Sequence, residues 1–514
     1  ERVAVWRRGL AERLRKQLER QALPRYIASQ RWYAAKGATI ARAHLADERV
    51  QTAAGAEWLL GLFDVEGDAE SARYFIPLTL AVGEGMQAAV GRLQAAAVAR
   101  VRQQAHTGLL ADAFADERFC RMLVEEIGRG GEQPLAHGRL RFTATQAYAE
   151  LRGDPAVELS VSAPLASSSN TALQLGERLF LKGYRRIRTG INPELEVGRF
   201  LTEVAHYPNI VPVAGALEYV GPDEAMATLA LLQGFVRNQG DLWTYTANYL
   251  ARFIEDRRTG TEPTADAHAG YLSLVRTLGT RTAELHQAFA TPTDDPLFAA
   301  EPIEASDVRD WRERAVAEAA AALELVSQSR EISEARRREA EELLRRHVRF
   351  DRHEARPASG GWGIKIRNHG DYHMGQVLLQ RNDFIIVDFE GEPARSLEER
   401  RRKSSPLRDV AGMLRSFAYA RYAALRAGGA ESGDDYTRLD PMLVKWEREC
   451  RAAFLDAYEA TARQAGLYPS FADVQPLLQL FEKQKALYEL RYELQNRPDW
   501  VGIPLRCLAE AAGV

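Results

Sequence analysis

The stretch from His369 to Pro393 limits the folds open to this chain more than any other part of it. Asp371 follows a His-Gly pair, Gln376 comes five residues later, and Asp388 ends an apolar run with the composition of a strand. A loop joined to such a strand brings an acid, an amide and a second acid to one cleft. Phosphoryl transfer uses this set, because one carboxylate orients the attacking hydroxyl while an amide and another carboxylate hold Mg²⁺ at the nucleotide phosphates. We therefore predict a small-molecule kinase with Asp371 as its base and Gln376 and Asp388 as its metal ligands.

The same order of acid, amide and acid occurs in protein kinases, which carry a lysine on an upstream strand and a glutamate on the helix that follows. Here Lys182 ends the strand-like run 179–182, and Glu196 stands one turn into a helix that Pro193 opens. We predict that Lys182 contacts the α- and β-phosphates of ATP and that Glu196 fixes its flexible stem. The alternative is a surface salt bridge, worth about 0 to 1 kcal/mol. The motif after His369 favours the nucleotide site.

Two further segments are predicted to bind the nucleotide. Ser168, Ser169 and Asn170 stand between two strand-like runs, where hydroxyls and backbone amides take the place of a glycine-rich loop. A Ser/Asn cluster between strands is also an ordinary turn, which is the alternative. The apolar run 229–235 leads into a predicted hinge, and we expect the backbone from Gln233 to Val236 to bind adenine.

Composition excludes several other classes of protein. The 514 residues carry 68 basic and 71 acidic side chains, so no bulk charge favours nucleic acid as a partner. No apolar run approaches the roughly 20 residues that a membrane span needs, so no membrane is expected. Three cysteines without a metal-ligand spacing favour a reducing compartment, and we predict a cytoplasmic protein. The first residue is Glu1, consistent with a portion of a longer polypeptide.

We predict an α+β fold in three parts: a cap at 1–108, a kinase amino lobe with an intermediate subdomain at 109–236, and a mostly helical carboxyl lobe at 237–514. The cluster Arg31-Trp32-Tyr33 in the cap is interpreted as an anchor at a domain interface, with a functional role as the alternative. Residues 109–127 are predicted helical, ahead of the amino-lobe strands 140–148, 156–162, 171–175 and 178–184. In the carboxyl lobe we expect a helical hairpin over 310–347 and helices at 272–289, 406–427, 442–465 and 474–495.

Side chains around the central motif are given supporting roles. His369 and His373 are predicted to hold the loop through backbone hydrogen bonds rather than to act as acid or base. Arg408 and Asp409 begin a helix after Pro406 and are predicted to tie the loop together. The basic run Arg400-Arg401-Arg402-Lys403 is interpreted as solvated. The alternative is that it flanks the entrance of the substrate site and attracts the phosphate charge.

The residues that make up the motif also resemble those of a known family. His-Gly-Asp and Asp-Phe-Glu stand where protein kinases have His-Arg-Asp and Asp-Phe-Gly, which is similar to the aminoglycoside-phosphotransferase-like branch. Asp-Phe-Glu-Gly-Glu-Pro-Ala-Arg from Asp388, the segment 29–37 around Arg31-Trp32-Tyr33, and the tail Arg-Pro-Asp-Trp closely resemble maltokinase. The sequence differs at Ala34-Ala35, where related signatures often carry glycine, and this difference bears only on the prediction for the cap.

This resemblance implies a bilobal kinase-like fold that uses ATP and Mg²⁺. It also implies phosphorylation of maltose at its anomeric hydroxyl, giving maltose 1-phosphate for α-glucan and glycogen synthesis from trehalose. The family includes fusions with trehalose synthase, which is the expected fused or associated partner. Two alternatives stay open: a kinase for an aminoglycoside or a modified ribose, and a non-catalytic module that uses the fold only for docking.

The acceptor sugar is predicted to bind the helix 481–495 and the turn after it. Tyr488 and Tyr492 are four residues apart, so they share one helix face and offer flat apolar surfaces to two linked sugar rings. Lys485 precedes them on the same stripe, and Arg497 or Trp500 is predicted to close the far end. Packing of these tyrosines in the core is the alternative.

Overall fold

The computed structural model describes residues 12–511 apart from 34, 36, 54, 69–70, 83–86, 104–105, 163–169, 261–265, 349–360 and 431–432. The chain divides into two compact units. Unit 1 comprises residues up to 203 together with 211–237, and unit 2 comprises 204–210 together with 238 onward. The short segment 204–210, inside the predicted amino lobe, therefore belongs with the carboxyl-terminal part of the chain. There Ile210 bridges Ile386 and the Asn209 side-chain amide donates to the Phe384 carbonyl at 2.8 Å.

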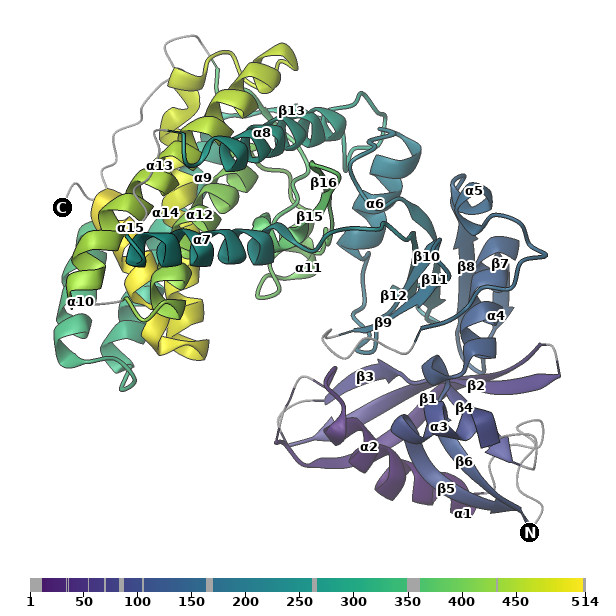
Figure 1. The fold of residues 1–514 in the computed structure, drawn as a ribbon. Coiled ribbons are helices and arrows are strands. Elements are labelled where there is room, and N and C mark those ends of the chain that lie inside the picture. Colours follow the sequence, from purple (N-terminus) through teal and green to yellow (C-terminus); the bar gives the residue numbers. More distant parts are fainter. Residues whose placement is uncertain are drawn as a thin grey trace. The chain divides into compact units, whose positions relative to one another are not determined.

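The first part of unit 1 is an antiparallel sheet with helical segments (Figure 1, purple to blue). Its strands follow the order β1-β2-β4-β6-β5, and β3 pairs with β2. The elements are α1 (Glu12–Gln17), η2 (Leu18–Ala22), α2 (Leu23–Ser29), β1 (Ile40–Ala53), β2 (Ala56–Gly67), β3 (Ser71–Phe75), β4 (Leu78–Val82), α3 (Gln87–Ala95), β5 (Ala97–Gln103), β6 (His106–Asp112) and η4 (Ala113–Ala115). Trp32 and Tyr33 are buried in the core between this sheet and the first helices. The predicted α+β cap is thus present.

A second antiparallel sheet in unit 1 has the order β7-β8-β11-β12-β10-β9. Its elements are α4 (Glu117–Arg129), β7 (Gly131–Pro134), β8 (Arg139–Ala144), α5 (Tyr148–Arg152), β9 (Thr171–Leu175), β10 (Leu179–Gly183), α6 (Pro193–Glu203), β11 (Val213–Val220) and β12 (Met226–Gly234). Buried Arg185, just after β10, pairs with Asp112 at 2.8 Å, and its guanidinium lies 5.3 Å from the Trp32 ring. This contact between cap and second sheet confirms the anchor interpretation for Trp32, whereas Arg31 is exposed and Tyr33 packs within the cap.

Three predicted elements in unit 1 were wrong. The strand predicted over 140–148 ends with β8 at Ala144, and Tyr148 begins α5. The helix predicted over 109–127 begins only at Glu117, because the Asp116 side chain accepts the Arg118 N–H as an N-cap and β6 occupies the residues before Ala113. Residues 156–162, all described, form no strand beyond an isolated bridge at Val161. The Arg152 guanidinium binds the carbonyls of 154, 155 and 157, and only residues 160–162 form backbone hydrogen bonds to 174 and 176.

Unit 2 is mainly helical, with short strands around the predicted catalytic motif (Figure 1, teal to yellow). Its elements are α7 (Leu242–Arg258), α8 (Ala269–Phe289), β13 (Glu301–Pro302), α9 (Ala305–Gln328), α10 (Glu334–Val348), β14 (Ile364–Lys365), η5 (Met374–Gln376), β15 (Val377–Gln380), β16 (Asp383–Ile386), α11 (Leu397–Arg401), α12 (Leu407–Ala427), α13 (Gly433–Gln464), α14 (Phe471–Asn496), η6 (Pro498–Trp500) and α15 (Gly502–Ala511). The predicted helical hairpin is α9 and α10. Within the described residues, no helix has both the length and the apolar character that crossing a membrane requires.

Candidate active site

Lys182 in unit 1 forms a buried ion pair on the inner strands of the second sheet. It lies on β10, and its Nζ is 2.7 Å from Glu194 Oε2, with only 13% and 4% of the two side chains exposed. The Tyr184 hydroxyl donates a short hydrogen bond to the same carboxylate oxygen. Such a pair fixes a lysine stem that would otherwise sample many rotamers. The carboxylate that performs the predicted role is therefore Glu194, and the choice of Glu196 was wrong.

The start of α6 explains this choice of carboxylate. The Asn192 side chain accepts the Glu194 N–H at 2.9 Å, which sets the first turn of the helix. Residues two apart on a helix point about 200° apart around its axis, so Glu194 and Glu196 cannot present their carboxylates to the same lysine. Glu194 is buried and Glu196 is half-buried. The helical register of α6 thus directs Glu194, two residues before the expected Glu196, toward Lys182.

The two carboxylates of α6 are predicted to differ in mutational effect. Glu194→Gln removes the charge that holds Lys182, so the KM for ATP should rise and kcat should fall, together by about tenfold or more in kcat/KM. Glu196→Gln is the matched control on the same helix and should change kcat/KM by less than about threefold. Steady-state kinetics at varied ATP measures both. Equal losses in the two variants would contradict the assignment of Glu194.

The remaining predicted nucleotide contacts in unit 1 are placed as follows. Ser168 and Ser169 lie outside the described residues. Asn170 is half-buried directly before β9, where Thr171 accepts a 2.6 Å hydrogen bond from Arg185. Gln233 lies in β12 and pairs with Phe180 of β10, and Val236 follows β12. These residues stay predicted nucleotide contacts.

In unit 2, a single buried carboxylate holds the loop that carries Asp371. Asp409 accepts the backbone N–H groups of His369 and Gly370 at 2.7 and 2.9 Å, and His286 Nε2 lies 3.4 Å away. Burial by itself would raise the pKa of Asp409, but the hydrogen bonds and the His286 charge outweigh it and lower the pKa. The predicted tie between the start of α12 and the loop is confirmed for Asp409.

The two histidines of the motif also bind backbone groups. His369 Nε2 contacts the Val387 carbonyl at 2.9 Å, and His373 Nδ1 accepts the Gly375 N–H at 3.1 Å. Burial lowers the pKa of His373, which favours its neutral form. These contacts confirm the predicted structural role of both histidines.

Gln376 and Asp388 meet at the base of the β15–β16 hairpin. Gln376 Nε2 donates to Asp388 Oδ2 at 3.0 Å, and the Val387 N–H donates to the Gln376 carbonyl at 3.0 Å. Asp388 has φ 68°, a left-handed conformation that side chains other than glycine rarely adopt, and such strain is typical of functional sites. With the amide nitrogen used by Asp388, the amide oxygen is the atom that Gln376 would offer to a cation. An amide oxygen and a carboxylate match the hard oxygen ligands that Mg²⁺ requires.

Asp371 contacts a lysine that comes from the C-terminal part of the chain. Lys485 on α14 places its Nζ 2.9 Å from Asp371 Oδ1 and 2.9 Å from Glu392 Oε1. Burial disfavours its charge, but the two carboxylates dominate and raise the pKa of Lys485. Glu392 is 3% exposed, and Lys485 with Arg395 lowers its pKa to about 2 despite its burial. The ammonium therefore stays charged and holds the Asp371 carboxylate against α14.

The predicted acceptor stripe divides into a part near Asp371 and a part away from it. The Lys485 Nζ lies 4.9 Å from the centre of the half-buried Tyr488 ring. Tyr492, one turn further, is 46% exposed, and the Arg497 guanidinium lies 5.6 Å from its ring. Trp500 is stacked on Tyr419 at 6.5 Å, with Arg497 and Arg426 at 4.7 and 5.7 Å from the ring. The structure thus brings Lys485 and Tyr488 to Asp371, whereas the Trp500 ring contacts Tyr419, Arg497 and Arg426.

The acidic residues that directly follow these tyrosines, Glu489 and Glu493, do not form a solvated face. Glu489 is buried and pairs with Arg415 at 2.9 Å, and buried Glu493 accepts hydrogen bonds from Tyr419 and Arg497. Their presence therefore gives no support to an acceptor surface. Tyr488 stays a candidate sugar contact because its ring lies beside Lys485, which binds Asp371.

Sequence reasoning missed two residues of this site, Glu194 and Glu392, and also the partner role of Lys485 toward Asp371. Glu392 lies in the Gly-Glu-Pro part of the motif, and Glu194 follows a helix-opening proline. The acidic residue at each of these two positions was therefore a local signal from which an ion pair could have been predicted. The contact between Lys485 and Asp371 spans 114 residues of sequence and has no local signal.

Comparisons with known proteins show which domains and folds this chain resembles. Residues 26–116 match the family model of the maltokinase N-terminal cap domain. A glucosamine kinase of Mycolicibacterium smegmatis is 28% identical over 293 residues, covering 56% of this chain and 64% of the relative. A glucosamine kinase of Streptacidiphilus jiangxiensis is 29% identical over 230 residues, covering 44% of this chain and 46% of the relative. The aligned part thus spans less than two thirds of either curated relative.

The solved structures extend the likeness to nearly the whole fold. A glucosamine kinase in complex with glucosamine, ADP and inorganic phosphate has a TM-score of 0.61 at 20% identity, covering 96% of this chain and 98% of that one. A second crystal form of a glucosamine kinase has a TM-score of 0.61 at 19% identity, covering 97% and 99%. At this identity the likeness concerns the fold. The chain therefore has a mixed α+β, kinase-like fold with a maltokinase-type N-terminal cap domain and a helical C-terminal part.

Proposed function

We propose that this chain is an ATP- and Mg²⁺-dependent sugar kinase that phosphorylates maltose at its anomeric hydroxyl, giving maltose 1-phosphate and ADP. The observation that carries the kinase proposal is the loop 369–376 with its hairpin. It presents Asp371 beside Lys485 and pairs Gln376 with Asp388 at 3.0 Å. The ion pair of Lys182 with Glu194 supplies the phosphate-binding lysine that the same chemistry needs.

Each residue has a role that its contacts support. Asp371 accepts the proton of the acceptor hydroxyl, and Asp409 fixes the backbone of the loop on which it stands. Gln376 and Asp388 would hold Mg²⁺, which when bound neutralises phosphate charge. Lys182, held by Glu194, orients the nucleotide phosphates. A non-catalytic docking module needs neither the buried Lys182 pair nor the strained Asp388, so enzymatic activity is the better proposal.

Maltose and glucosamine are the two acceptors to separate. The cap model supports maltose, and the names of the relatives support glucosamine as the second candidate. The Lys485 ammonium, which lies 2.9 Å from both Asp371, the proposed base, and Glu392, favours a neutral acceptor beside it. A protonated amino sugar would meet a like charge there, and such repulsion disfavours binding in a poorly solvated site.

The experiment is an initial-rate comparison of MgATP consumption with maltose, glucosamine, glucose and an aminoglycoside. We expect the highest kcat/KM with maltose. A higher value with glucosamine would overturn the maltose proposal and leave a sugar kinase. Consumption with none of the sugars would overturn both. Lys485→Met, which removes the ammonium, should lose activity toward maltose and should reduce the preference for maltose over glucosamine.

The two tyrosines of α14 are predicted to contribute unequally to acceptor binding. Tyr488→Ala should raise the KM for maltose about fivefold or more, since one ring contact is worth about 1 kcal/mol. Tyr492→Ala should have a smaller effect, and the KM for ATP should change little in both variants. Thermal melting accompanies the kinetics. An unchanged maltose KM with a lower melting temperature in Tyr488→Ala would show that this ring belongs to the core.

A further inference from the structure

Unit 2 contains a cavity of about 220 Å³ between α9 and the segment that runs from Gly391 to α12. Gly370, next to Asp371, also lines it, but none of the groups proposed above to bind nucleotide or metal does. Its charged lining comprises six basic and four acidic side chains: Arg314, Arg395, Arg400, Arg402, Lys403, Arg408, Asp307, Asp310, Glu392 and Glu399. Which of these charges already have partners decides what the cavity can hold.

Most of the lining charges have a partner within the protein. Arg395 pairs with Glu392, Arg402 with Glu398, and Lys403 with Glu301. Asp307 is neutralised by Lys365 at 2.8 Å, and Glu399 accepts the Ser396 N–H. Asp310 is exposed, so water screens its charge. These groups leave the cavity without a buried negative charge in need of a cation.

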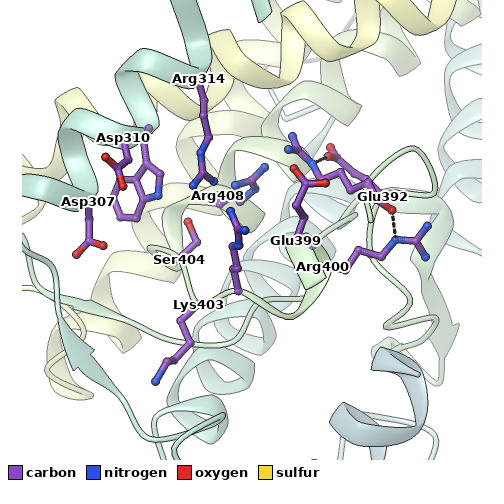
Figure 2. A pocket seen from close by; sticks show the side chains of 14 residues that line it. Asp307, Asp310, Arg314, Glu392, Glu399, Arg400, Lys403, Ser404 and Arg408 are labelled. Atoms are coloured by element: carbon purple, nitrogen blue, oxygen red, sulfur yellow. Dashed lines mark hydrogen bonds and ion pairs between the residues drawn. The ribbon is translucent and has the colours of Figure 1, made fainter. Parts of the chain in front are cut away.

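Three donors of the lining have no such partner among the residues that the structure describes. The guanidinium groups of Arg314 and Arg408 make neither a hydrogen bond nor an ion pair, although both residues are only partly exposed. The Ser404 hydroxyl is buried and has no hydrogen-bond partner. Figure 2 shows Arg314 reaching from α9 toward Arg408, with Ser404 beside them. Two positive charges that point toward each other in a partly desolvated space destabilise the folded state unless an anion lies beside them.

The environment of Arg408 agrees with a missing counter-ion. Burial is the main cause that lowers the pKa of its guanidinium, and the nearby Arg395 lowers it further. The carboxylates of Glu392 and Glu318 act in the opposite direction but do not restore the pKa. An anion beside Arg408 would remove this cost.

We propose that this cavity binds a small phosphate anion, either inorganic phosphate or the phosphoryl group of a sugar phosphate, between Arg314, Arg408 and Ser404. The guanidinium group presents a planar fork of N–H donors that matches two phosphate oxygens, and a serine hydroxyl supplies a third donor. In the sequence, the basic run 400–403 had phosphate binding as its alternative role. Arg402 and Lys403 are already paired, so we assign phosphate binding to Arg314 and Arg408, which lie close to this run. This site goes beyond the proposed function and does not require it.

The test is calorimetric titration of inorganic phosphate into the full chain, with the nucleotide site saturated by a non-hydrolysable ATP analogue and Mg²⁺. We expect saturable binding to the wild type and at least a tenfold higher Kd in Arg314→Gln, in Arg408→Gln and in Ser404→Ala combined with either, because each variant removes a charged hydrogen bond to the phosphate. Arg346→Gln is the matched control, because Arg346 is exposed on α10 and pairs with Glu342. It should bind phosphate as the wild type does.

A parallel titration with glucose 1-phosphate distinguishes the two sources of the phosphoryl group. Tighter binding of the ester identifies a sugar-phosphate site, and tighter binding of the free ion identifies a phosphate site. Absence of saturable binding of both below about 10 mM, or equal affinity in the wild type and the arginine variants, would overturn the proposal. If Arg408→Gln does not fold, Arg314→Gln decides the result, because a half-buried helix position tolerates this change.

Discussion

Asp371→Asn is expected to lower kcat by at least about a hundredfold while leaving the affinity for MgATP nearly unchanged. The amide retains the shape of the side chain and one acceptor oxygen for Lys485, but it cannot take a proton from the acceptor hydroxyl. The nucleotide contacts proposed in unit 1 do not involve this side chain. Steady-state kinetics with maltose and equilibrium binding of a fluorescent ATP analogue measure the two effects separately.

A matched control excludes a general effect of replacing aspartate. Asp435→Asn changes a carboxylate that pairs with Arg258 on the surface, at 2.9 Å and 39% exposure, and should leave kcat unchanged. If Asp371→Asn retained the wild-type kcat, Asp371 would not be the base. A loss of ATP affinity equal to the loss in kcat would instead assign it to the nucleotide site.

The second large effect is expected at Asp409, whose carboxylate organises the loop without touching the proposed reactants. Asp409→Asn replaces one acceptor oxygen by an amide that faces N–H donors, leaving at least one buried loop amide unpaired. An unsatisfied buried group costs about 1 to 3 kcal/mol, and more where a charge was involved. We therefore expect hydrogen exchange at His369 and Gly370 to accelerate by about tenfold or more, with a parallel fall in kcat.

Exchange elsewhere separates a local effect from global destabilisation. Amides in the core of α13, away from the loop, should exchange at nearly the wild-type rate in Asp409→Asn. Unchanged protection at His369 and Gly370 would show that Asp409 does not hold the loop. Faster exchange throughout unit 2 would show that it supports the whole unit instead.

The catalytic hairpin could be predicted from sequence because its parts are local. Asp371, Gln376 and Asp388 lie within a single loop and two short strands, so the spacing alone brings amide and second acid together, as the 3.0 Å bond shows. The helical hairpin α9–α10 was equally accessible, since its amphipathic pattern and polar break are properties of neighbouring residues. The buried Trp32 was predictable as an anchor from its type, but its partner Arg185 was not.

Partners far apart in sequence could not be predicted. Lys485 was assigned to the sugar because it shares a helix stripe with Tyr488, and only the tertiary packing of α14 reveals its ion pairs with Asp371 and Glu392. The choice between Glu194 and Glu196 depends on the helical register of α6, which sequence patterns place only to within a residue or two. Residues 156–162 have strand-like composition, yet only 160–162 form backbone hydrogen bonds to 174 and 176, while Arg152 binds the carbonyls of 154, 155 and 157. In each case a side-chain contact overrides local propensity.

The central proposal is phosphoryl transfer from ATP to the anomeric hydroxyl of maltose, and the most direct test is identification of the product. Wild-type protein is incubated with MgATP and maltose, and the sugar is examined by ³¹P and ¹H nuclear magnetic resonance. We predict a phosphate monoester whose phosphorus couples to the anomeric proton of the reducing ring, absent with Asp371→Asn. Consumption of ATP without a phosphorylated sugar, or a phosphorus coupled to any other sugar proton, would contradict the proposal.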